Sequence, residues 1–308
     1  MTDIAITAKG LTRYFGKRPV VNQIDFQVPT GSVTGLLGLN GAGKTTTLRM
    51  LMGLLEPTRG TCSILGVETH QWSTEHRARI GYTFEGHFLY SWMRLADVER
   101  FQRGTFPKWD GLQFREIVSR FGIAPDTPAG KLSRGQRAGV SLAMTLSTHP
   151  EVLVLDDPAL GLDPISRRAL NETLLEFVSD SQRTILISTH LLDDVERIAD
   201  RILIMVDGRI LVDSSIEMFR ERVSVWTIEL NERRVAAESI PGLVHAYRSH
   251  DRWQFTVVNS NDETEAALMA LGGSNLQHQS GSFDESVVSY LSRSRTDGSF
   301  LRSEKVRD

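Results

Sequence analysis

The stretch Gly38-Leu39-Asn40-Gly41-Ala42-Gly43-Lys44-Thr45 decides the fold of this chain. It fits the pattern G-x-x-x-x-G-K-[ST] of a loop that wraps around phosphate groups. Its glycines let the backbone curl so that amide groups point inward, and the helix that follows adds its positive end. A short apolar run, 33–38, precedes the loop, and a helical pattern follows from Lys44 to about Met52. This strand–loop–helix context predicts a nucleotide-binding α/β fold, whereas an ordinary glycine-rich turn would not require it.

Side chains of this loop supply charge and a metal ligand. We expect Lys44 to reach the β- and γ-phosphates of a nucleoside triphosphate, and the Thr45 hydroxyl to bind Mg²⁺. The residues expected to contact the nucleotide in this part of the chain are Gly38, Asn40, Gly41, Ala42, Gly43, Lys44, Thr45 and Thr46.

A second element of the expected site, which ends in an acidic residue, follows about a hundred residues later. Val152-Leu153-Val154-Leu155-Asp156 is an apolar strand that ends in a carboxylate. A carboxylate at the carboxyl end of a parallel strand lies at the rim of the sheet, where ligands bind in open α/β folds. We therefore expect Asp156 to help Thr45 hold the metal ion. The alternative role of Asp156 is to cap a helix after a core strand.

The overall composition excludes several classes of protein. With 308 residues, 40% of them hydrophobic and 24% charged, the chain is an ordinary globular one with room for a large and a small domain or for two domains of moderate size. A net charge of −3 gives no sign of nucleic-acid binding. The sequence contains no run of 18 apolar residues, the length that a helix needs to cross a bilayer. A membrane role would therefore need a separate chain. The single cysteine, Cys62, fits a reducing compartment.

The periodicity of apolar residues predicts two folded units and a tail. Strands and helices alternate between residues 152 and 206, which is typical of a mostly parallel sheet, while residues 94–150 have helical spacing. From about Val225 the pattern changes to short strands and helices. The predicted domains are a nucleotide-binding domain at 1–222 with a helical subdomain at about 86–150, a small accessory α/β module at 223–292 and a flexible tail at 293–308.

Several ordered motifs over about residues 3–220 resemble the ATP-binding cassette (ABC) ATPases, the motor subunits of ABC transporters. Leu132-Ser133-Arg134-Gly135-Gln136 stands where the family has its LSGGQ signature, and Asp156-Asp157-Pro158 is similar to its D-E-P motif. Gly161-Leu162-Asp163-Pro164 matches the D-loop, and Ser188-Thr189-His190 matches the switch histidine. The resemblance implies an α/β P-loop NTPase of the ABC type, with a mostly parallel sheet core, an antiparallel β subdomain, a helical subdomain and a small C-terminal α/β module.

The resemblance also implies a site that two cassettes share. In this family the signature faces the γ-phosphate held by the opposite cassette, so that two cassettes close head-to-tail on two ATP molecules. Ser133, Gly135 and Gln136 would bind the nucleotide of the second cassette. His190 would contact the γ-phosphate and the attacking water. Phe15 is similar to the aromatic residue that stacks on adenine, with Tyr14 as the alternative if the register differs by one residue.

Three positions depart from the family pattern. Asp157 replaces the glutamate expected to orient or deprotonate the attacking water, Glu85 replaces the Q-loop glutamine, and Arg134 replaces the first glycine of the signature pair. Glu85 can still turn an oxygen toward Mg²⁺, and Arg134 would bring a cation near the opposing phosphates. Asp157 matters most because its side chain is one methylene shorter, and a displacement of ~1 Å can lower a rate on the order of 100-fold. The expected catalytic residues are thus Asp157, His190 and Glu85.

The resemblance further implies the cofactors and partners. The cofactors would be ATP and Mg²⁺, and the partners a separate transmembrane permease and a second cassette, with a homodimer favoured over a heterodimer and no nucleic acid. The protein would then lie at the cytoplasmic face of the cell membrane as a peripheral subunit, with the aromatic-rich segment 85–110 toward the permease. Arg134 is similar to the residue found in the signature of some exporter-type cassettes, which favours export. The C-terminal module resembles, more weakly, the extension of drug and antibiotic exporter cassettes through Ser282–Val287, and its role is either regulatory or dimer-stabilising, or that of a structural cap. The alternatives are a degenerate cassette that binds ATP with little turnover, and a soluble ABC ATPase unconnected with transport.

Overall fold

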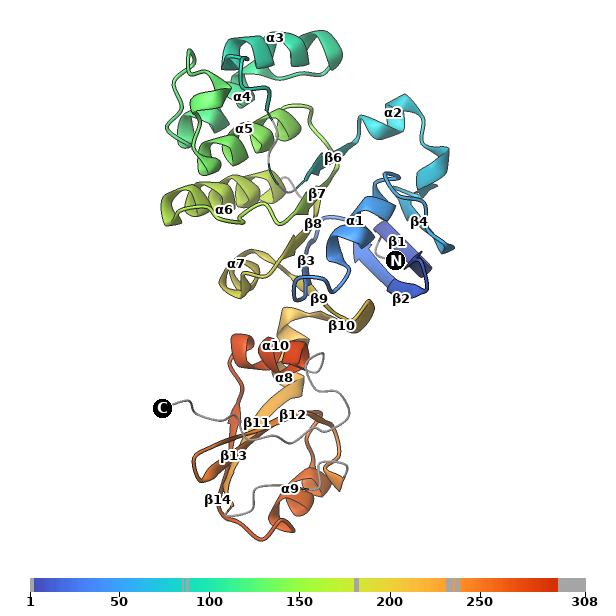
Figure 1. Cartoon of the computed structure of the whole chain (residues 1–308), viewed down its shortest axis with the longest axis vertical. Coiled ribbons are helices and arrows are strands. Elements are labelled where there is room, and N and C mark those ends of the chain that lie inside the picture. Colours follow the sequence, from blue (N-terminus) through green and yellow to red (C-terminus); the bar gives the residue numbers. More distant parts are fainter. Residues whose placement is uncertain are drawn as a thin grey trace.

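The computed structural model describes residues 3–84, 86, 89–179, 183–230, 235 and 239–292. They form three sheets with helices packed on them: the central sheet and the β1–β2 sheet lie side by side, and the third sheet lies beyond them along the long axis (Figure 1). Predictions that concern Glu85, Phe88 and the tail 293–308 lie outside the described residues.

A six-stranded sheet with the order β10-β9-β3-β8-β7-β6 forms the centre of the fold. The pairs β3–β9, β3–β8, β7–β8 and β6–β7 are parallel, and only β10 runs antiparallel to its neighbour. The turn that joins β9 to β10 is Asp207-Gly208, both with positive φ, as hairpin turns of this length require. The strands are β3 (Val33–Leu37), β6 (Ile80–Thr83), β7 (Val152–Asp156), β8 (Thr184–Thr189), β9 (Arg201–Val206) and β10 (Arg209–Ser215).

Helices cover both faces of the central sheet, and the side chains of β7 show how. Val152 and Val154 point to one face and join the core beneath α1, while Leu153 and Leu155 point to the other and join the core beneath α5 and α6. A strand buried on both faces must be apolar throughout, which explains the uninterrupted apolar run in the sequence. The helices on the central sheet are α1 (Lys44–Leu51), α5 (Arg134–Leu146), α6 (Pro164–Ser179) and α7 (Leu192–Ile198).

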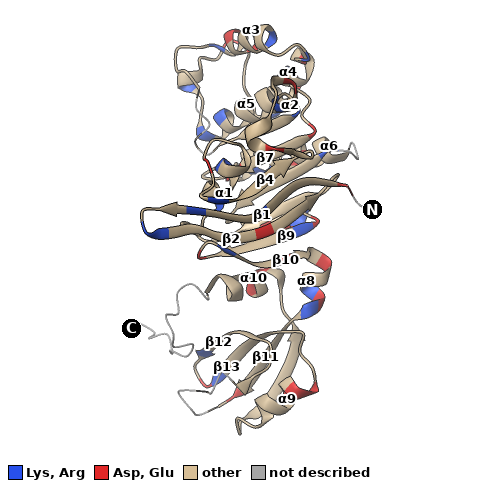
Figure 2. Cartoon of the chain, turned by 90° about the vertical axis from the view of Figure 1, so that its right-hand side faces the viewer, with Lys and Arg blue, Asp and Glu red and all other residues tan. Residues whose placement is uncertain are grey.

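An antiparallel sheet with the order β2-β1-β4-β5 lies on the α1 side, and a helical region lies at the opposite end of the central sheet (Figure 1). In Figure 2 the ribbon at the tip of the β1–β2 hairpin has the colour of Lys and Arg, in keeping with Lys17 and Arg18 in the sequence. The remaining elements of these parts are β1 (Ile4–Phe15), β2 (Arg18–Pro29), β4 (Arg59–Ile64), β5 (Val67–Glu68), α2 (Thr74–Arg77), α3 (Leu95–Thr105), α4 (Gly111–Arg120) and the 3₁₀ turns η1 (Thr69–Gln71) and η2 (Ala129–Lys131).

The third sheet, with the order β12-β13-β11-β14, is antiparallel throughout. The last helix of the described chain, α10, turns back toward the central sheet. Its residues Phe283, Val287 and Tyr290 share one buried cluster with Ile202 and Ile204 of β9. The predicted boundary between residues 222 and 223 therefore stays a prediction. The elements are α8 (Ile216–Arg222), β11 (Val223–Glu229), β12 (Leu243–Ser249), β13 (Arg252–Val258), α9 (Asp262–Met269), β14 (Ser274–Ser280) and α10 (Phe283–Ser292).

No helix among the described residues is long and apolar enough to cross a membrane.

Candidate nucleotide-binding site

The glycine-rich loop connects the end of β3 to the start of α1. Gly43 has φ +111°, in the left-handed region, and a Cβ at this position would lie 2.7 Å from the carbonyl oxygen of Val20. Only glycine fits both the conformation and the space. The loop encloses one side of a cavity of about 310 Å³, whose other side is formed by the carboxyl end of β7 and the residues that follow it.

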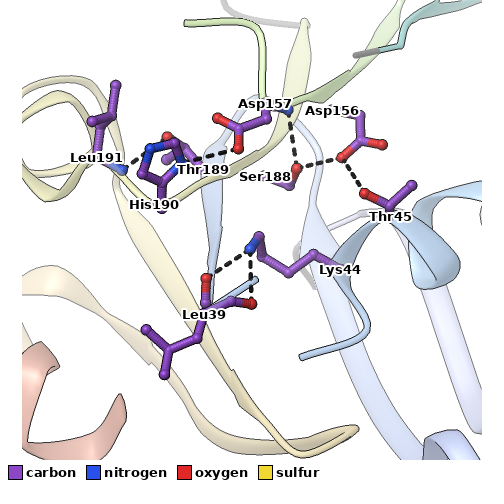
Figure 3. A network of polar contacts seen from close by, with 10 residues as sticks. Leu39, Lys44, Thr45, Asp156, Asp157, Ser188, Thr189, His190 and Leu191 are labelled. Carbon is purple, nitrogen blue, oxygen red and sulfur yellow. Dashed lines mark hydrogen bonds and ion pairs between the residues drawn. The ribbon is translucent and has the colours of Figure 1, made fainter. Parts of the chain in front are cut away.

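The Lys44 side chain folds back over the loop (Figure 3). Its Nζ donates to the carbonyl oxygen of Gly38 at 2.6 Å and to that of Leu39 at 3.3 Å, and the residue is only 7% exposed. An ammonium group taken out of water must be compensated by acceptors, and two backbone carbonyls supply part of that compensation. Phosphate oxygens in the cavity would be stronger acceptors for the same group because they are charged.

Thr45 and Asp156 meet at the rim of the sheet. The Thr45 hydroxyl donates to Oδ1 of Asp156 at 3.1 Å, and the same oxygen accepts a second bond from the Ser188 hydroxyl at 2.7 Å. Hard oxygen ligands from a few side chains, with water completing the shell, are what Mg²⁺ takes at nucleotide sites. The pair therefore fits Mg²⁺ by the chemistry of its donors.

Asp157 is held by the neighbouring strand and by His190. Its backbone adopts a left-handed conformation with φ +47°, and its N–H lies 3.0 Å from the carbonyl oxygen and 3.1 Å from the hydroxyl of Ser188. One carboxylate oxygen, Oδ2, lies 2.9 Å from Nδ1 of His190 (Figure 3). The other, Oδ1, is buried without a hydrogen-bond partner in the described parts of the chain. Asp157 lines the cavity, and a buried acceptor of this kind is ready for a hydrogen-bond donor such as water.

Tyr82 of β6 pairs with Val154 and lies beside the Asp156 carboxylate. Burial and then the negative charge of Asp156 raise the pKa of Tyr82 to about 12, so that its phenol stays neutral at physiological pH. The carboxylates at the cavity therefore face no additional negative charge from this side chain.

The signature residues lie at the start of α5, away from the cavity. Ser133 is the N-cap of this helix: its hydroxyl accepts from the N–H of Gln136 at 3.2 Å, and Oε1 of Gln136 accepts from the N–H of Ser133 at 3.0 Å. Gly135 is buried, and a Cβ there would collide with the hydroxyl of Ser166 in α6. The first turn of α5 is therefore packed on the first turn of α6, while Ser133 and Arg134 remain exposed.

Arg134 does not extend freely into solvent. A Cβ on Gly161, which has φ +68°, would lie 2.6 Å from Nη1 and 2.9 Å from Cζ of Arg134. The guanidinium thus lies directly against the backbone of Gly161 in the D-loop. This contact could not be anticipated from the position of Arg134 in the signature alone.

The structure brings together one group of predicted residues and leaves others apart. Phe15 is half exposed, with the Arg13 guanidinium 5.0 Å from its ring centre, and it does not line the cavity. Gly38, Ala42 and His190 adjoin the cavity through the loop and through Asp157, and the three signature residues stand apart on α5. The predicted residues that line the cavity are Asn40, Gly41, Gly43, Lys44, Thr45, Thr46, Asp156 and Asp157.

Ser188 is a site residue whose role the sequence did not reveal. It stands opposite Asp156 in the parallel pairing of β7 with β8, and its polar groups bind both Asp156 and Asp157. The available signal was a serine at the end of a buried apolar strand, because a hydroxyl in that place needs a partner.

The site combines a glycine-rich loop before a helix, a carboxylate pair at the end of a strand and a histidine directly after the adjacent strand. Together these features define a P-loop nucleotide-binding domain. Comparison with known sequences identifies the class more closely. The family described as ABC transporter matches residues 21–160. The Nod factor export ATP-binding protein I of Sinorhizobium fredii is 31% identical over 289 residues, which are 90% of this chain and 82% of the relative.

Other relatives include the bacitracin transport ATP-binding protein BcrA of Bacillus licheniformis, 30% identical over 70% of this chain and 72% of its own. The hypophosphite import ATP-binding protein HtxD of Stutzerimonas stutzeri is 32% identical over 72% and 71%. A solved structure of an ATP-binding subunit of an ABC transporter superposes with a TM-score of 0.63 and 27% identity over 70% of this chain and 92% of that one. The chain therefore belongs to the ABC transporter family, as an ATP-binding subunit, and the predicted fold class is confirmed.

Proposed function

We propose that this protein hydrolyses ATP together with a second cassette and so drives a separate membrane permease, in the direction of export. The observation that carries the proposal is the convergence on one cavity of a lysine, a Thr45–Asp156 pair and an Asp157–His190 pair. These groups supply, in that order, a cation for phosphates, ligands for a metal ion, and an acceptor for a proton.

The residues of the cavity would divide the work as follows. Lys44 exchanges its carbonyl partners for the β- and γ-phosphates, and the loop amides bind the same phosphates. Thr45 and Asp156 would hold Mg²⁺, whose positive charge would offset the charge of the phosphates. Oδ1 of Asp157 accepts a hydrogen bond from the attacking water and then its proton, while His190 holds Oδ2 and orients the carboxylate. Because aspartate reaches less far than glutamate, we expect slow turnover.

The signature supports the need for a second cassette. Ser133 and Arg134 are exposed at the positive end of a 13-residue helix and lie outside the cavity of their own chain. An anion-binding helix end that serves no ligand of its own chain suits a nucleotide on another chain. Asp157 and Arg134, both departures from the family pattern, occur in the same chain, which favours two identical cassettes over two different ones.

The surface proposed for the permease lies in the helical region. The side chains of Tyr90 and Trp92 are 57% and 72% exposed, with their ring centres 5.9 Å apart. Exposed aromatic side chains that lie together often mark a surface where another molecule binds. Contact with a permease would place the protein on the cytoplasmic face of the membrane.

Export is proposed because the alignment with the Nod factor exporter extends over 90% of the chain, against 72% for the hypophosphite importer.

The test compares Lys44→Ala with Lys9→Ala, which removes an exposed lysine of β1. Binding of a fluorescent ATP analogue and release of phosphate with Mg²⁺-ATP are measured on the purified proteins. We expect Lys44→Ala to lower turnover by about 100-fold or more and to weaken binding, since it removes a preorganised cation from the transferring phosphate. Lys9→Ala should match the unmodified protein. Equal hydrolysis by both variants would contradict the proposal, and binding without hydrolysis by the unmodified protein would favour the degenerate cassette.

A further inference from the structure

A network of three polar side chains joins α6 to α7. Nε of Arg167 lies 2.7 Å from both carboxylate oxygens of Asp194, and Nδ2 of Asn171 donates to Oδ1 of the same carboxylate at 2.7 Å. The other end of the guanidinium, Nη2, lies 3.7 Å from Asp193. Arg167 and Asn171 belong to α6, and Asp194 belongs to α7. We call this network the α6–α7 clamp.

Burial makes the clamp different from an ordinary surface ion pair. Asp194 is 6% exposed and Asn171 is 4% exposed. A carboxylate in such a place must keep its partners, because an unpaired buried charge is strongly unfavourable. Contact of one guanidinium nitrogen with both carboxylate oxygens, together with the amide bond, also fixes the relative orientation of the two helices. The next residue, Arg168, makes an exposed pair with Glu172 on the same helix, and this is its one ion pair within the part of the chain that the structure describes.

At its first turn, α6 contacts the signature. Asp163 caps this turn by accepting from the N–H groups of Ile165 and Ser166, both at 3.0 Å, and from the Ser166 hydroxyl at 2.6 Å. Ser166 in turn lies so close to Gly135 that no Cβ fits between them. A shift of the start of α5 must therefore displace the start of α6, one residue before Arg167.

At its own start, α7 is tied to the histidine of the cavity. Leu191 is the N-cap of α7, and its N–H donates to the Thr189 hydroxyl at 3.0 Å. His190 stands between these two residues and contacts Asp157 at 2.9 Å. The short connection leaves His190 little freedom to move independently of the helix that begins two residues later.

We propose that Arg167 is a positioning residue that couples the two nucleotide sites to which one chain contributes. The inference rests on the proposed function, in which Ser133 faces the nucleotide of the second cassette and His190 serves the nucleotide of its own chain. Closure of the signature on the distant nucleotide moves α6, the clamp carries that movement to α7, and α7 sets His190 against Asp157. Arg167 does not line the cavity, so it acts on the site through Asp194.

The kinetic test compares Arg167→Gln with the matched control Arg168→Gln, at a temperature where melting curves show both proteins folded. Asp194→Asn is the second variant, because it keeps an oxygen for Arg167 and Asn171 and so perturbs folding less. We expect Arg167→Gln to lower kcat about 10-fold while KM for ATP changes less than about 2-fold, with Asp194→Asn in the same direction. A residue that only stabilises the fold would lower the melting temperature and leave kcat unchanged. Equal kcat for Arg167→Gln and Arg168→Gln would overturn the proposal.

Hydrogen exchange gives an independent readout. In the unmodified protein with ATP under non-hydrolysing conditions, amides of both α6 and α7 should gain protection. In Arg167→Gln, the gain should persist in α6 and fall at least about 3-fold in α7. Retention of the full gain in α7 would overturn the clamp while leaving the proposed function intact. Two controls establish that the exchange reports on the cavity. The Lys44→Ala protein should lose nucleotide binding, and the Arg168→Gln protein should keep the full gain of protection in α7.

Discussion

The cavity and the signature, which are the two parts of the chain that we propose to face nucleotides, differ in how their polar groups are satisfied. At the cavity, Lys44, Asp156 and Asp157 are buried and bonded to groups of the same chain. At the signature, Ser133 and Arg134 are exposed, and among the described residues the hydroxyl of Ser133 is engaged by the capping bond with Gln136 alone. The first part is arranged before any ligand arrives, whereas the second presents helix-end donors outward. This difference is what a site completed by another chain requires.

The sharpest test of the cavity is Asp157→Asn. Asparagine tolerates the left-handed backbone of this position as well as aspartate does, so the fold should persist. Loss of the proton acceptor should lower hydrolysis about 100-fold, while ATP binding remains and an ATP-bound dimer accumulates. Phosphate release and size-exclusion chromatography with ATP measure the two effects. Asp157→Glu should raise turnover. Unchanged hydrolysis by Asp157→Asn would mean that the base lies elsewhere, with Glu85 as the first candidate.

The signature is tested by Ser133→Ala against Ser215→Ala. Both serines are N-caps whose hydroxyls accept from the third following amide at 3.2 Å, Ser133 in α5 and Ser215 in α8. Each substitution should lower stability by about 1 kcal/mol. Only Ser133→Ala should also lower turnover, by about 10-fold, and weaken ATP-dependent dimerisation, as measured by light scattering. If Ser215→Ala reduced turnover equally, loss of stability alone would explain the effect.

The variant Trp92→Ala tests whether the helical region contacts the permease. The side chain is 72% exposed, so its removal should leave melting temperature and basal ATPase activity nearly unchanged. Transport by the complex with its permease should fall several-fold, because a central aromatic contact is lost. Leu112→Ala, which removes a side chain that is 75% exposed on α4, is the control. Equal transport by the two variants would place the permease elsewhere.

The smallest expected effect is at the contact between α10 and α7. Partial desolvation and then the charges of Asp193 and Glu196 raise the pKa of Asp284, so the ionised form is disfavoured in the folded protein. The penalty is present at neutral pH and disappears as pH falls through this raised pKa. Asp284→Asn should therefore stabilise the protein at pH 7 by at most about 0.5 kcal/mol, because the group is exposed. Urea unfolding at pH 7 and below pH 4 should show the gain only at the higher pH. A gain that does not depend on pH would contradict this origin.

The central sheet could be predicted because its strands are buried on both faces and therefore read as unbroken apolar runs, as in Val152–Asp156. The edge strand Ser274–Ser280 could not, since Leu276 is its only large apolar residue and most of the strand is exposed. The four-residue strand Ile80–Thr83 is too short to show a period.

The candidate site likewise has a part that the sequence predicts and a part that it does not. Residues of the loop could be placed from their spacing, because the loop is a local structure. The bonds of Ser188 to Asp156 and Asp157 arise from the register of two strands that are distant in sequence. The packing of Arg134 on Gly161 likewise depends on how the start of α5 meets the loop before α6. Such contacts are set by tertiary structure, which no single-sequence pattern encodes.

The return of α10 to β9 has a consequence for how the protein is made. Ile202 and Ile204 leave the ribosome some eighty residues before Phe283 and Tyr290, which cover them in the finished structure. At roughly 5–20 residues per second, the interval is on the order of 4–16 s. During that time, the part of this apolar cluster that Phe283, Val287 and Tyr290 cover in the finished structure stays exposed, although earlier residues such as Ile216 and Phe219 are already made. The nascent chain thus passes through an aggregation-prone stage, in which assistance by a chaperone would be most effective.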